Sequence, residues 1–176
     1  MNIVGATLAG KVIAYITWNS FNNVWDVGTT LDDEPSLDYL TDIVAPAVNP
    51  NTAASPTIVG MYGSDLDHLG TVADAGHNHG LDVAPYLYTD SSGDYGPTLS
   101  QIVSAGKVST LVSSIDSLLS TYDLDGIVLD PEDGSSSTTL NTVISALYAT
   151  LNPEGKFIDI TGPPYGSPSI TTTTAS

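Results

Sequence analysis

Five short apolar segments alternate with helical segments along most of the chain, and this alternation limits the folds that are open to it. The apolar segments are rich in β-branched or aromatic residues and lie at 11–18, 42–49, 81–88, 125–130 and 156–161. Apolar residues recur at helical spacing over 64–80, 98–122 and 137–151. Nearly continuous apolar strands that alternate with helices are typical of a parallel sheet covered by helices. The sequence therefore predicts an α/β fold.

Two interruptions of this pattern give further expectations. Residues 48–63 are predicted to leave the sheet as a small extra hairpin, because Asn, Pro and Gly recur between two apolar stretches. The last helix is predicted to stop at Asn152, because Pro153 would clash with a continuing helical turn.

The fourth apolar segment carries acids at its end, in the stretch YDLDGIVLDPEDG over 122–134. Side chains alternate along a strand, so Asp130 and Glu132 are predicted to share one face, and Ile127 and Leu129 the other. Parallel α/β sheets place their active sites at the carboxyl ends of strands, and neighbouring buried acids raise each other's pKa, as a general acid requires. Spacing alone equally allows loop acids that cap a helix beginning near Ser136.

The same stretch resembles the signature of glycoside hydrolase family 18, the chitinases and their relatives, which is written DGxDxDxE. Asp125-Gly126 matches its opening, Asp130 its second core Asp and Glu132 its catalytic glutamate. KVIAYITW and LTDIVAPAVNPN resemble the first two strands of the family. AGHNHGLDVAPYL and LYATLNPEGKFIDITGPP resemble later helix–strand pieces in the same order. The resemblance spans roughly residues 11–165.

The resemblance implies a parallel TIM-barrel-like fold of which the chain holds the first five strands. The alternative is a five-stranded doubly wound sheet of the flavodoxin type. Strand order distinguishes the two, because a partial barrel has the order 1-2-3-4-5 and the doubly wound sheet has 2-1-3-4-5.

The resemblance also implies roles for individual side chains. Glu132 would protonate the glycosidic oxygen, and the substrate's own N-acetyl carbonyl oxygen would be the nucleophile. Asp130 would hold the acetamido group, and Tyr15 would line the barrel floor. The further substrate-binding candidates are Asp125, Tyr86 and Trp18. No cofactor is implied.

Several aromatic residues lie at predicted strand ends or in loops, where they could stack on sugar rings or equally cover the rim of the core. They are Trp18, Trp25, Tyr86, Tyr88 and Tyr95.

The sequence departs from the family pattern within the motif and after the third strand. Val128 stands at the first core Asp, Pro131 at the aromatic before the glutamate, and PYLYTDSSGD replaces a Ser-x-Gly-Gly turn. We therefore expect a chitinase-like glycan-binding or structural subunit of an extracellular or viral assembly, with impaired catalysis. The alternative is an active family 18 glycosidase that hydrolyses β-1,4-linked N-acetylglucosamine polymers.

The net charge of the chain limits the classes of molecule that it can bind. The chain has 20 acids against three Lys and no Arg, a net charge of −17, which argues against nucleic acid and anionic membrane. No apolar run is long enough to span a membrane. Few basic residues and many Ser and Thr suit a high-salt or extracellular setting. We expect an extracellular or virion-associated protein, although MNIVGATLAG lacks the basic region of a signal peptide.

Metal binding is not expected. His77 and His79 would not share a helical face, and His68 lies a further turn or more away. The acidic runs LDDEPSLD and DPEDG lack EF-hand spacing, so they are interpreted as solvated loops.

Association is expected from the strand edges. The chain is divided into an arm at 1–10, a domain at 11–165 and a Ser/Thr-rich tail at 166–176. A five-strand fragment of a barrel leaves its first and fifth strands as open edges, which natural proteins seldom tolerate. We expect a homo-oligomer or filament in which the arm and the tail reach a neighbouring copy.

Overall fold

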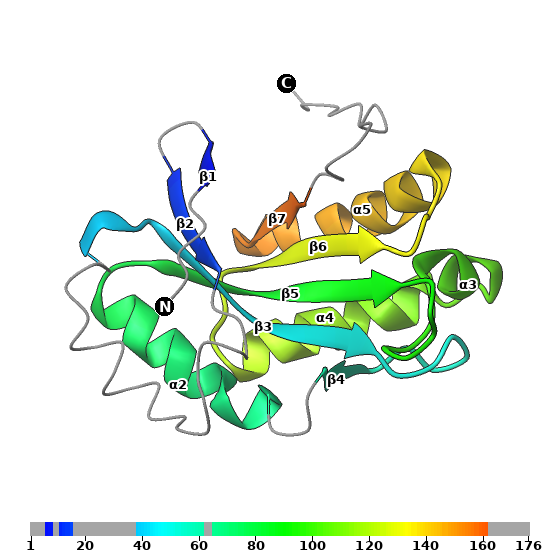
Figure 1. Ribbon diagram of the computed structural model, residues 1–176, viewed down its shortest axis with the longest axis horizontal. Coiled ribbons are helices and arrows are strands. Elements are labelled where there is room, and N and C mark those ends of the chain that lie inside the picture. Colours follow the sequence, from blue (N-terminus) through cyan, green and yellow to red (C-terminus); the bar gives the residue numbers. More distant parts are fainter. Residues whose placement is uncertain (1–5, 9–10, 16–37, 62–64, 162–176) are drawn as a thin grey trace.

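The structure is a computed structural model that describes residues 6–8, 11–15, 38–61 and 65–161. These residues form one seven-stranded sheet with helices packed on it (Figure 1). The strands are β1 (Ala6–Leu8), β2 (Lys11–Tyr15), β3 (Asp42–Pro50), β4 (Ile58–Gly60), β5 (Asp82–Asp90), β6 (Gly126–Glu132) and β7 (Phe157–Ile160). The helices are α2 (Asp65–Asn78), α3 (Leu99–Ser104), α4 (Val108–Thr121) and α5 (Ser137–Leu151), followed by a 3₁₀ turn over Asn152–Glu154.

The five strands expected from the sequence are present and run parallel in chain order. They are β2, β3, β5, β6 and β7, each hydrogen-bonded to the next. A doubly wound sheet would place the first of these strands between the second and the third. The parallel α/β fold with sequential strand order is therefore confirmed, and the flavodoxin-like alternative is wrong.

Two short antiparallel strands extend the sheet. β4 pairs with the end of β3, with Val48 opposite Gly60, so the small hairpin expected over 48–63 is present. The expectation that this segment leaves the sheet is wrong, because β4 extends the sheet. β1 pairs with β2, with Ala6 opposite Ile13. The expectation of a bare edge on the first parallel strand is therefore wrong. The backbone N–H and C=O groups on this edge of β2 are hydrogen-bonded to β1, which lies next to it in the sequence. The entropy cost of bringing two such neighbouring segments together is small.

The helical segment expected over 98–122 is divided into two helices. Gly106 adopts a left-handed φ of 67°, and the backbone N–H of Lys107 donates to the carbonyl of Ile102 at 3.1 Å. This arrangement ends α3 one turn before α4 begins, because a residue with positive φ cannot continue a right-handed helix. α5 ends at Leu151, immediately before Asn152-Pro153, as the sequence predicts.

The two faces of the sheet are packed differently. Ile43, Val83, Ile127 and Leu129 point to the face covered by the helices and join one large buried cluster. The opposite face carries a smaller buried cluster of Ile13, Val44, Ala84 and Val128. Alternation along each strand thus sends one set of side chains under the helices and the other into the concave side of the sheet.

Candidate functional site

The carboxyl ends of β5 and β6 bring tyrosines and acids side by side. Parallel pairing sets Tyr88 opposite Asp130, and Asp90 opposite Glu132. Asp130 and Glu132 are two residues apart on one strand and therefore share the concave face, as the sequence predicts. The structure thus brings the two acids of the motif together at the end of the sheet where parallel α/β proteins place their sites.

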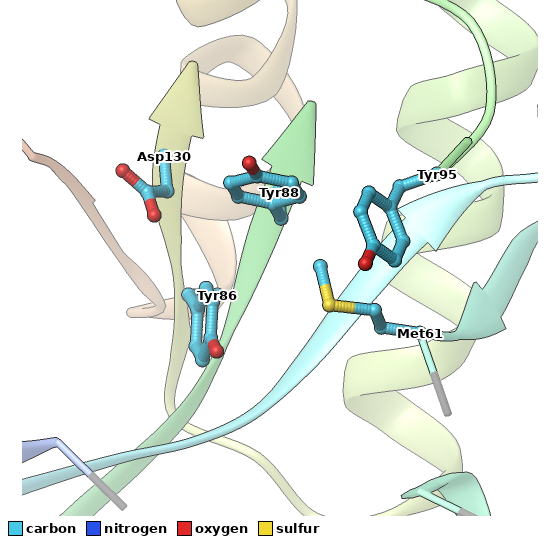
Figure 2. Close-up of a pocket in the computed structure, with 5 residues that line it drawn as sticks. All are labelled: Met61, Tyr86, Tyr88, Tyr95 and Asp130. Carbon is cyan, nitrogen blue, oxygen red and sulfur yellow. The ribbon is translucent and has the colours of Figure 1, made fainter. Parts of the chain in front are cut away.

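A pocket of about 230 Å³ opens on this face (Figure 2). Figure 2 shows Tyr86 and Tyr88 from β5 beside Asp130 from β6, with Met61 and Tyr95 pointing toward them from the side of β4. The lining residues are Met61, Tyr86, Tyr88, Tyr95 and Asp130. The pocket is therefore largely aromatic, with a carboxylate at one wall.

Asp130 is half-buried and is held by the strand next to it. The hydroxyl of Thr161 donates to Oδ1 of Asp130, and Thr161 also anchors its own backbone N–H on the carbonyl of Leu129 at 2.8 Å. Burial raises the pKa of Asp130, the bond from Thr161 lowers it, and the negative charge of Glu132 raises it again. The net effect is an upward shift, so this carboxyl holds a proton more readily than an exposed Asp does.

Glu132 is exposed and is bonded to a tyrosine. The hydroxyl of Tyr88 donates to Oε2 of Glu132 at 3.2 Å. The ring of Tyr88 in turn meets the ring of Tyr95 edge to face, with 5.6 Å between the centroids and 76° between the planes. A chain of contacts therefore runs from the loop that carries Tyr95 to the carboxylate of Glu132.

Tyr15 lies at the end of β2 and packs on the concave cluster together with Tyr86. Burial raises the pKa of Tyr15, and the charges of Asp130 and Asp159 raise it further. Tyr15 therefore lies on the concave face of the sheet, the face that also carries Asp130, and its role in lining a sugar site stays a prediction. Trp18, the remaining aromatic candidate of the motif-based site, lies outside the described residues.

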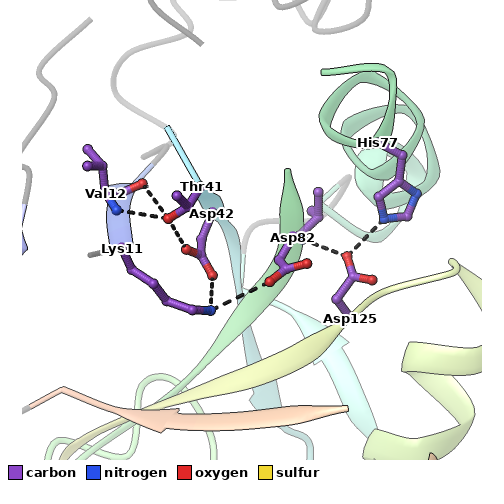
Figure 3. Close-up of polar contacts among 8 residues, drawn as sticks. Lys11, Val12, Thr41, Asp42, His77, Asp82 and Asp125 are labelled. Carbon is purple, nitrogen blue, oxygen red and sulfur yellow. Dashed lines mark hydrogen bonds and ion pairs between the residues drawn. The ribbon is translucent and has the colours of Figure 1, made fainter. Parts of the chain in front are cut away.

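Asp125 lies at the opposite end of β6 and is not part of the pocket (Figure 3). Its Oδ2 accepts the backbone N–H of Val83 at 2.7 Å and contacts Nε2 of His77 at 2.8 Å. The structure therefore does not bring this substrate-binding candidate to Asp130 and Glu132. Its place is structural, because it joins α2, β5 and β6 at the amino end of the sheet.

The alternative interpretation, in which the acids of this stretch cap a helix, holds for Asp133, the residue after Glu132. Asp133 is buried and accepts the backbone N–H groups of Leu99 at 2.6 Å and Ser135 at 2.8 Å. Ser136 caps α5 by accepting from the backbone of Thr139. Asp133 thus ties the starts of α3 and α5 to the end of β6, while the two acids before it remain on the concave face.

Two pocket neighbours were missed by the sequence analysis. Met61 follows β4, and Thr161 follows β7, so both reach Asp130 or the tyrosines only through the folding of distant segments. Their residue types carry no distinctive signal. The third-strand departure PYLYTDSSGD was a clue only to the aromatic part of the pocket, since it contains Tyr86 and Tyr88 and is followed directly by Tyr95.

The loop that carries Tyr95 is fitted closely to the end of β3. Gly96 has a φ of 89°, and a Cβ atom there would lie 2.0 Å from the carbonyl oxygen of Pro50. Only glycine allows both the backbone conformation and this approach. The position of Tyr95 is thereby set by contact with the hairpin that leads toward Met61.

The described residues contain no group of three His, Asp or Glu side chains that could hold a metal ion. His77 is bonded to Asp125, and Nδ1 of His79 lies 3.5 Å from Oδ1 of Asp38. None of the helices in the part of the chain that the structure describes is both long enough and apolar enough to cross a membrane.

Solved structures share this fold, although no protein-family model matches the chain. No curated protein matches it either. A chitinase from Bacteroides thetaiotaomicron aligns with a TM-score of 0.64 and 18% identity, over 84% of this chain and 45% of that one. The catalytic domain of a family GH18 chitinase from the fern Peteris ryukyuensis gives 0.59 and 22%, over 86% and 57%. The chitinase-like agglutinin RobpsCRA from Robinia pseudoacacia gives 0.63 and 13%, over 84% and 45%.

These likenesses define the class of fold: an α/β protein with part of a TIM barrel. More narrowly, its fold is similar to the N-terminal part of the barrel of chitinases, including those of glycoside hydrolase family 18, so the resemblance seen in the sequence is confirmed in the fold. The chain spans about half the length of the solved structures it matches.

Proposed function

We propose that this chain is a chitinase-like glycan-binding domain for oligosaccharides that contain N-acetylglucosamine. The observation that carries the proposal is the pocket in which three tyrosines surround Asp130 at the carboxyl ends of β5 and β6. The proteins that share the fold support it, because they include a chitinase-like agglutinin as well as chitinases.

The chemistry of the pocket suits a sugar. Tyrosine rings offer flat apolar faces for the C–H faces of a pyranose, and Met61 adds a flexible apolar contact. Asp130 and Glu132 accept hydrogen bonds from hydroxyl or acetamido N–H groups. Small-ligand sites generally combine such apolar walls with a few placed polar groups.

Impaired catalysis is part of the proposal. Val128, at the position of the family's first core Asp, is 2% exposed in the concave cluster and supplies no proton partner for Asp130. Glu132 is exposed and bonded to Tyr88, whereas a general acid that works near neutral pH is usually shielded from water. Binding without efficient turnover is the outcome that this arrangement favours.

Titration calorimetry with N-acetylated chito-oligosaccharides tests the proposal. The wild-type chain should bind, and Tyr86→Ala should weaken binding about tenfold, since a buried tyrosine contact typically contributes 1–2 kcal/mol. Tyr148→Ala is the matched control, because Tyr148 is a half-exposed residue of α5 that does not line the pocket. Absence of any binding by the wild-type chain would overturn the proposal.

The second candidate function is hydrolysis of β-1,4-linked N-acetylglucosamine polymers with Glu132 as the acid. It is favoured by one observation: burial and the nearby Glu132 raise the pKa of Asp130, as in a working carboxyl pair. Release of chromophore from a chitobiose substrate that is lost in Glu132→Gln would establish this activity and overturn the view of impaired catalysis.

We also propose that copies of this chain associate into a structural assembly, either extracellular or on a virion. Among the described residues, β7 pairs with β6 on one side and with no strand on the other. Its side chains Ile158 and Ile160 are only partly buried. A free edge of this kind accepts a strand of a second copy. Light scattering at moderate salt should show a dimer or larger species, and a monomer at micromolar concentration would contradict it.

A further inference from the structure

We propose that Tyr88 is a positioning residue for Glu132, and that its hydroxyl fixes the carboxylate while its ring forms a wall of the pocket. The inference concerns how the acid of the motif is held. Its consequence for ligand binding rests on the glycan-binding function proposed above, but the contact between the two side chains can be tested without any ligand.

Strand register makes this contact possible. Tyr88 faces Asp130 directly across the β5–β6 pair, and Glu132 lies one same-face position further along β6. Diagonal neighbours on one face of a sheet lie about 7–8 Å apart at the backbone, a distance that a long phenol side chain spans. A shorter side chain on β5 would leave Glu132 without this partner.

The ring of Tyr88 is itself held in place. Its edge-to-face contact with Tyr95 and its position in the pocket beside Met61 restrict rotation about the side-chain bonds. Aromatic pairs of this geometry contribute about 0.5–1.5 kcal/mol beyond their buried area. The hydroxyl therefore points along β6 because the ring cannot turn freely.

The hydroxyl remains a donor over the whole physiological pH range. Burial, the charge of Glu132, the hydrogen bond to Glu132 and the charges of Asp90 and Asp130 together raise the pKa of Tyr88 to about 12. A phenol that keeps its proton can only donate to a carboxylate. Its partner is Oε2 of Glu132, so Oε1 would be the oxygen that accepts a hydrogen bond from a ligand.

The bond is long, at 3.2 Å, and partly exposed to water. Hydrogen bonds at sites without ligand are often long and shorten when a ligand excludes water. A bound sugar that covers Tyr88 would strengthen the contact in this way. Tyr88 and Glu132 should then contribute to affinity as a unit.

Carbon-13 carboxyl labelling of glutamate gives a direct measurement of the contact. The chain has three glutamates, Glu34, Glu132 and Glu154, so each signal can be assigned by a single substitution to Gln. Tyr88→Phe should shift the carboxyl signal of Glu132, because it removes the hydrogen bond to Oε2, and should leave the signal of Glu154 unchanged. Tyr148→Phe, the control, should change none of them.

The reciprocal measurement follows the tyrosine. With carbon-13 at Cζ of tyrosine, the Tyr88 signal should titrate near pH 12 in the wild type. In Glu132→Gln it should titrate at lower pH, because the negative charge that opposes the phenolate is removed. If Tyr88→Phe leaves the Glu132 signal unchanged and Glu132→Gln leaves the Tyr88 titration unchanged, the positioning role is overturned, whether or not the chain binds sugar.

A double-substitution cycle connects the contact to binding. Tyr88→Phe and Glu132→Gln should each weaken binding of N-acetylated chito-oligosaccharides about tenfold, and the double variant should be no weaker than either single one. If the losses of binding free energy in the two single variants add up in the double variant, Tyr88 and Glu132 do not act as a unit. If the wild type binds no sugar, the proposed function fails, and the two carbon-13 measurements still decide the role of Tyr88.

Discussion

The Nζ atom of Lys11 lies 4.9 Å from the centre of the Phe157 ring, although the two residues belong to β2 and β7 at opposite ends of the parallel strand order. Neighbouring strands lie about 4.8 Å apart, so in a flat sheet β2 and β7 would be about 19 Å apart. The sheet is therefore strongly curled. The same ammonium group lies 2.7 Å from Asp42 and 3.5 Å from Asp82, which joins four of the parallel strands at the amino end (Figure 3).

Replacement of Lys11 should destabilise the fold. Asp42 is 1% exposed, and Lys11→Met leaves its carboxylate with the hydroxyl of Thr41, 2.5 Å away, as remaining partner. Loss of a hydrogen bond to a buried charged group typically costs about 2 kcal/mol in the free energy of unfolding. Urea denaturation measures this loss. Lys107→Met, outside the network, should change stability by about 0.5 kcal/mol or less, and equal effects of both variants would contradict the assignment.

Two glycine-to-alanine changes should have opposite signs. A Cβ on Gly126 would lie 2.5 Å from the backbone carbonyl of Phe157, so Gly126→Ala should force β6 and β7 apart and cost about 1–3 kcal/mol. Gly70 lies within α2 and has room for a methyl group, 3.7 Å from the ring of Tyr122. Gly70→Ala should therefore stabilise by about 0.5–1 kcal/mol. Thermal unfolding of both variants checks the pair, and stabilisation by Gly126→Ala would contradict the close contact.

Asp125 should matter for stability and not for ligand binding. Asp125→Ala leaves the buried backbone N–H of Val83 without its carboxylate and should cost about 1–3 kcal/mol. Sugar affinity, measured where the variant is still folded, should stay within about twofold of the wild type, since the pocket lies at the other end of β6. A tenfold loss of affinity with unchanged stability would show that Asp125 contributes to ligand binding and not to the stability of the fold.

The stability of the chain should depend on the ionisation of Asp130. Its folded-state pKa is raised by burial, so the folded chain holds this proton more tightly than the unfolded chain does. The contribution of this group to stability is therefore present below the ordinary carboxyl pKa of 3.8 and is lost as the pH rises through the folded-state value.

Asp130→Asn removes this dependence while it keeps an oxygen for Thr161. The free energy of unfolding of the variant, relative to that of the wild type, should increase from about pH 3 to about pH 7. Urea denaturation across that range measures it. A difference that stays constant or decreases with pH would show that the pKa is not raised.

Much of the arrangement follows from local sequence patterns. Alternation along GIVLDPE places Ile127 and Leu129 under the helices and Asp130 on the concave face. The position of Asp125 also follows from geometry, because five residues of strand span about 16 Å and separate it from Asp130. Asp125 and Asp130 belong to one sequence motif, but the strand between them places the two side chains at opposite ends of the sheet.

Other features depend on contacts between distant segments. Met61 and Thr161 approach the pocket because β4 folds back on β3 and β7 pairs with β6. The pairing of residues 6–8 with β2 requires only a short turn, but three residues give too weak a pattern to predict it. In the same way, the long helical pattern over 98–122 hides the break at Gly106, since apolar spacing continues through it.

The close fit of Gly96 against Pro50 has a kinetic consequence. The loop that carries Tyr95 is held in place before a ligand binds. Binding therefore does not have to order this loop, and the entropy cost of ordering a mobile loop is absent on this side of the pocket. Encounter should then occur in a single step, and differences in affinity among sugars should appear mainly in how long each one stays bound.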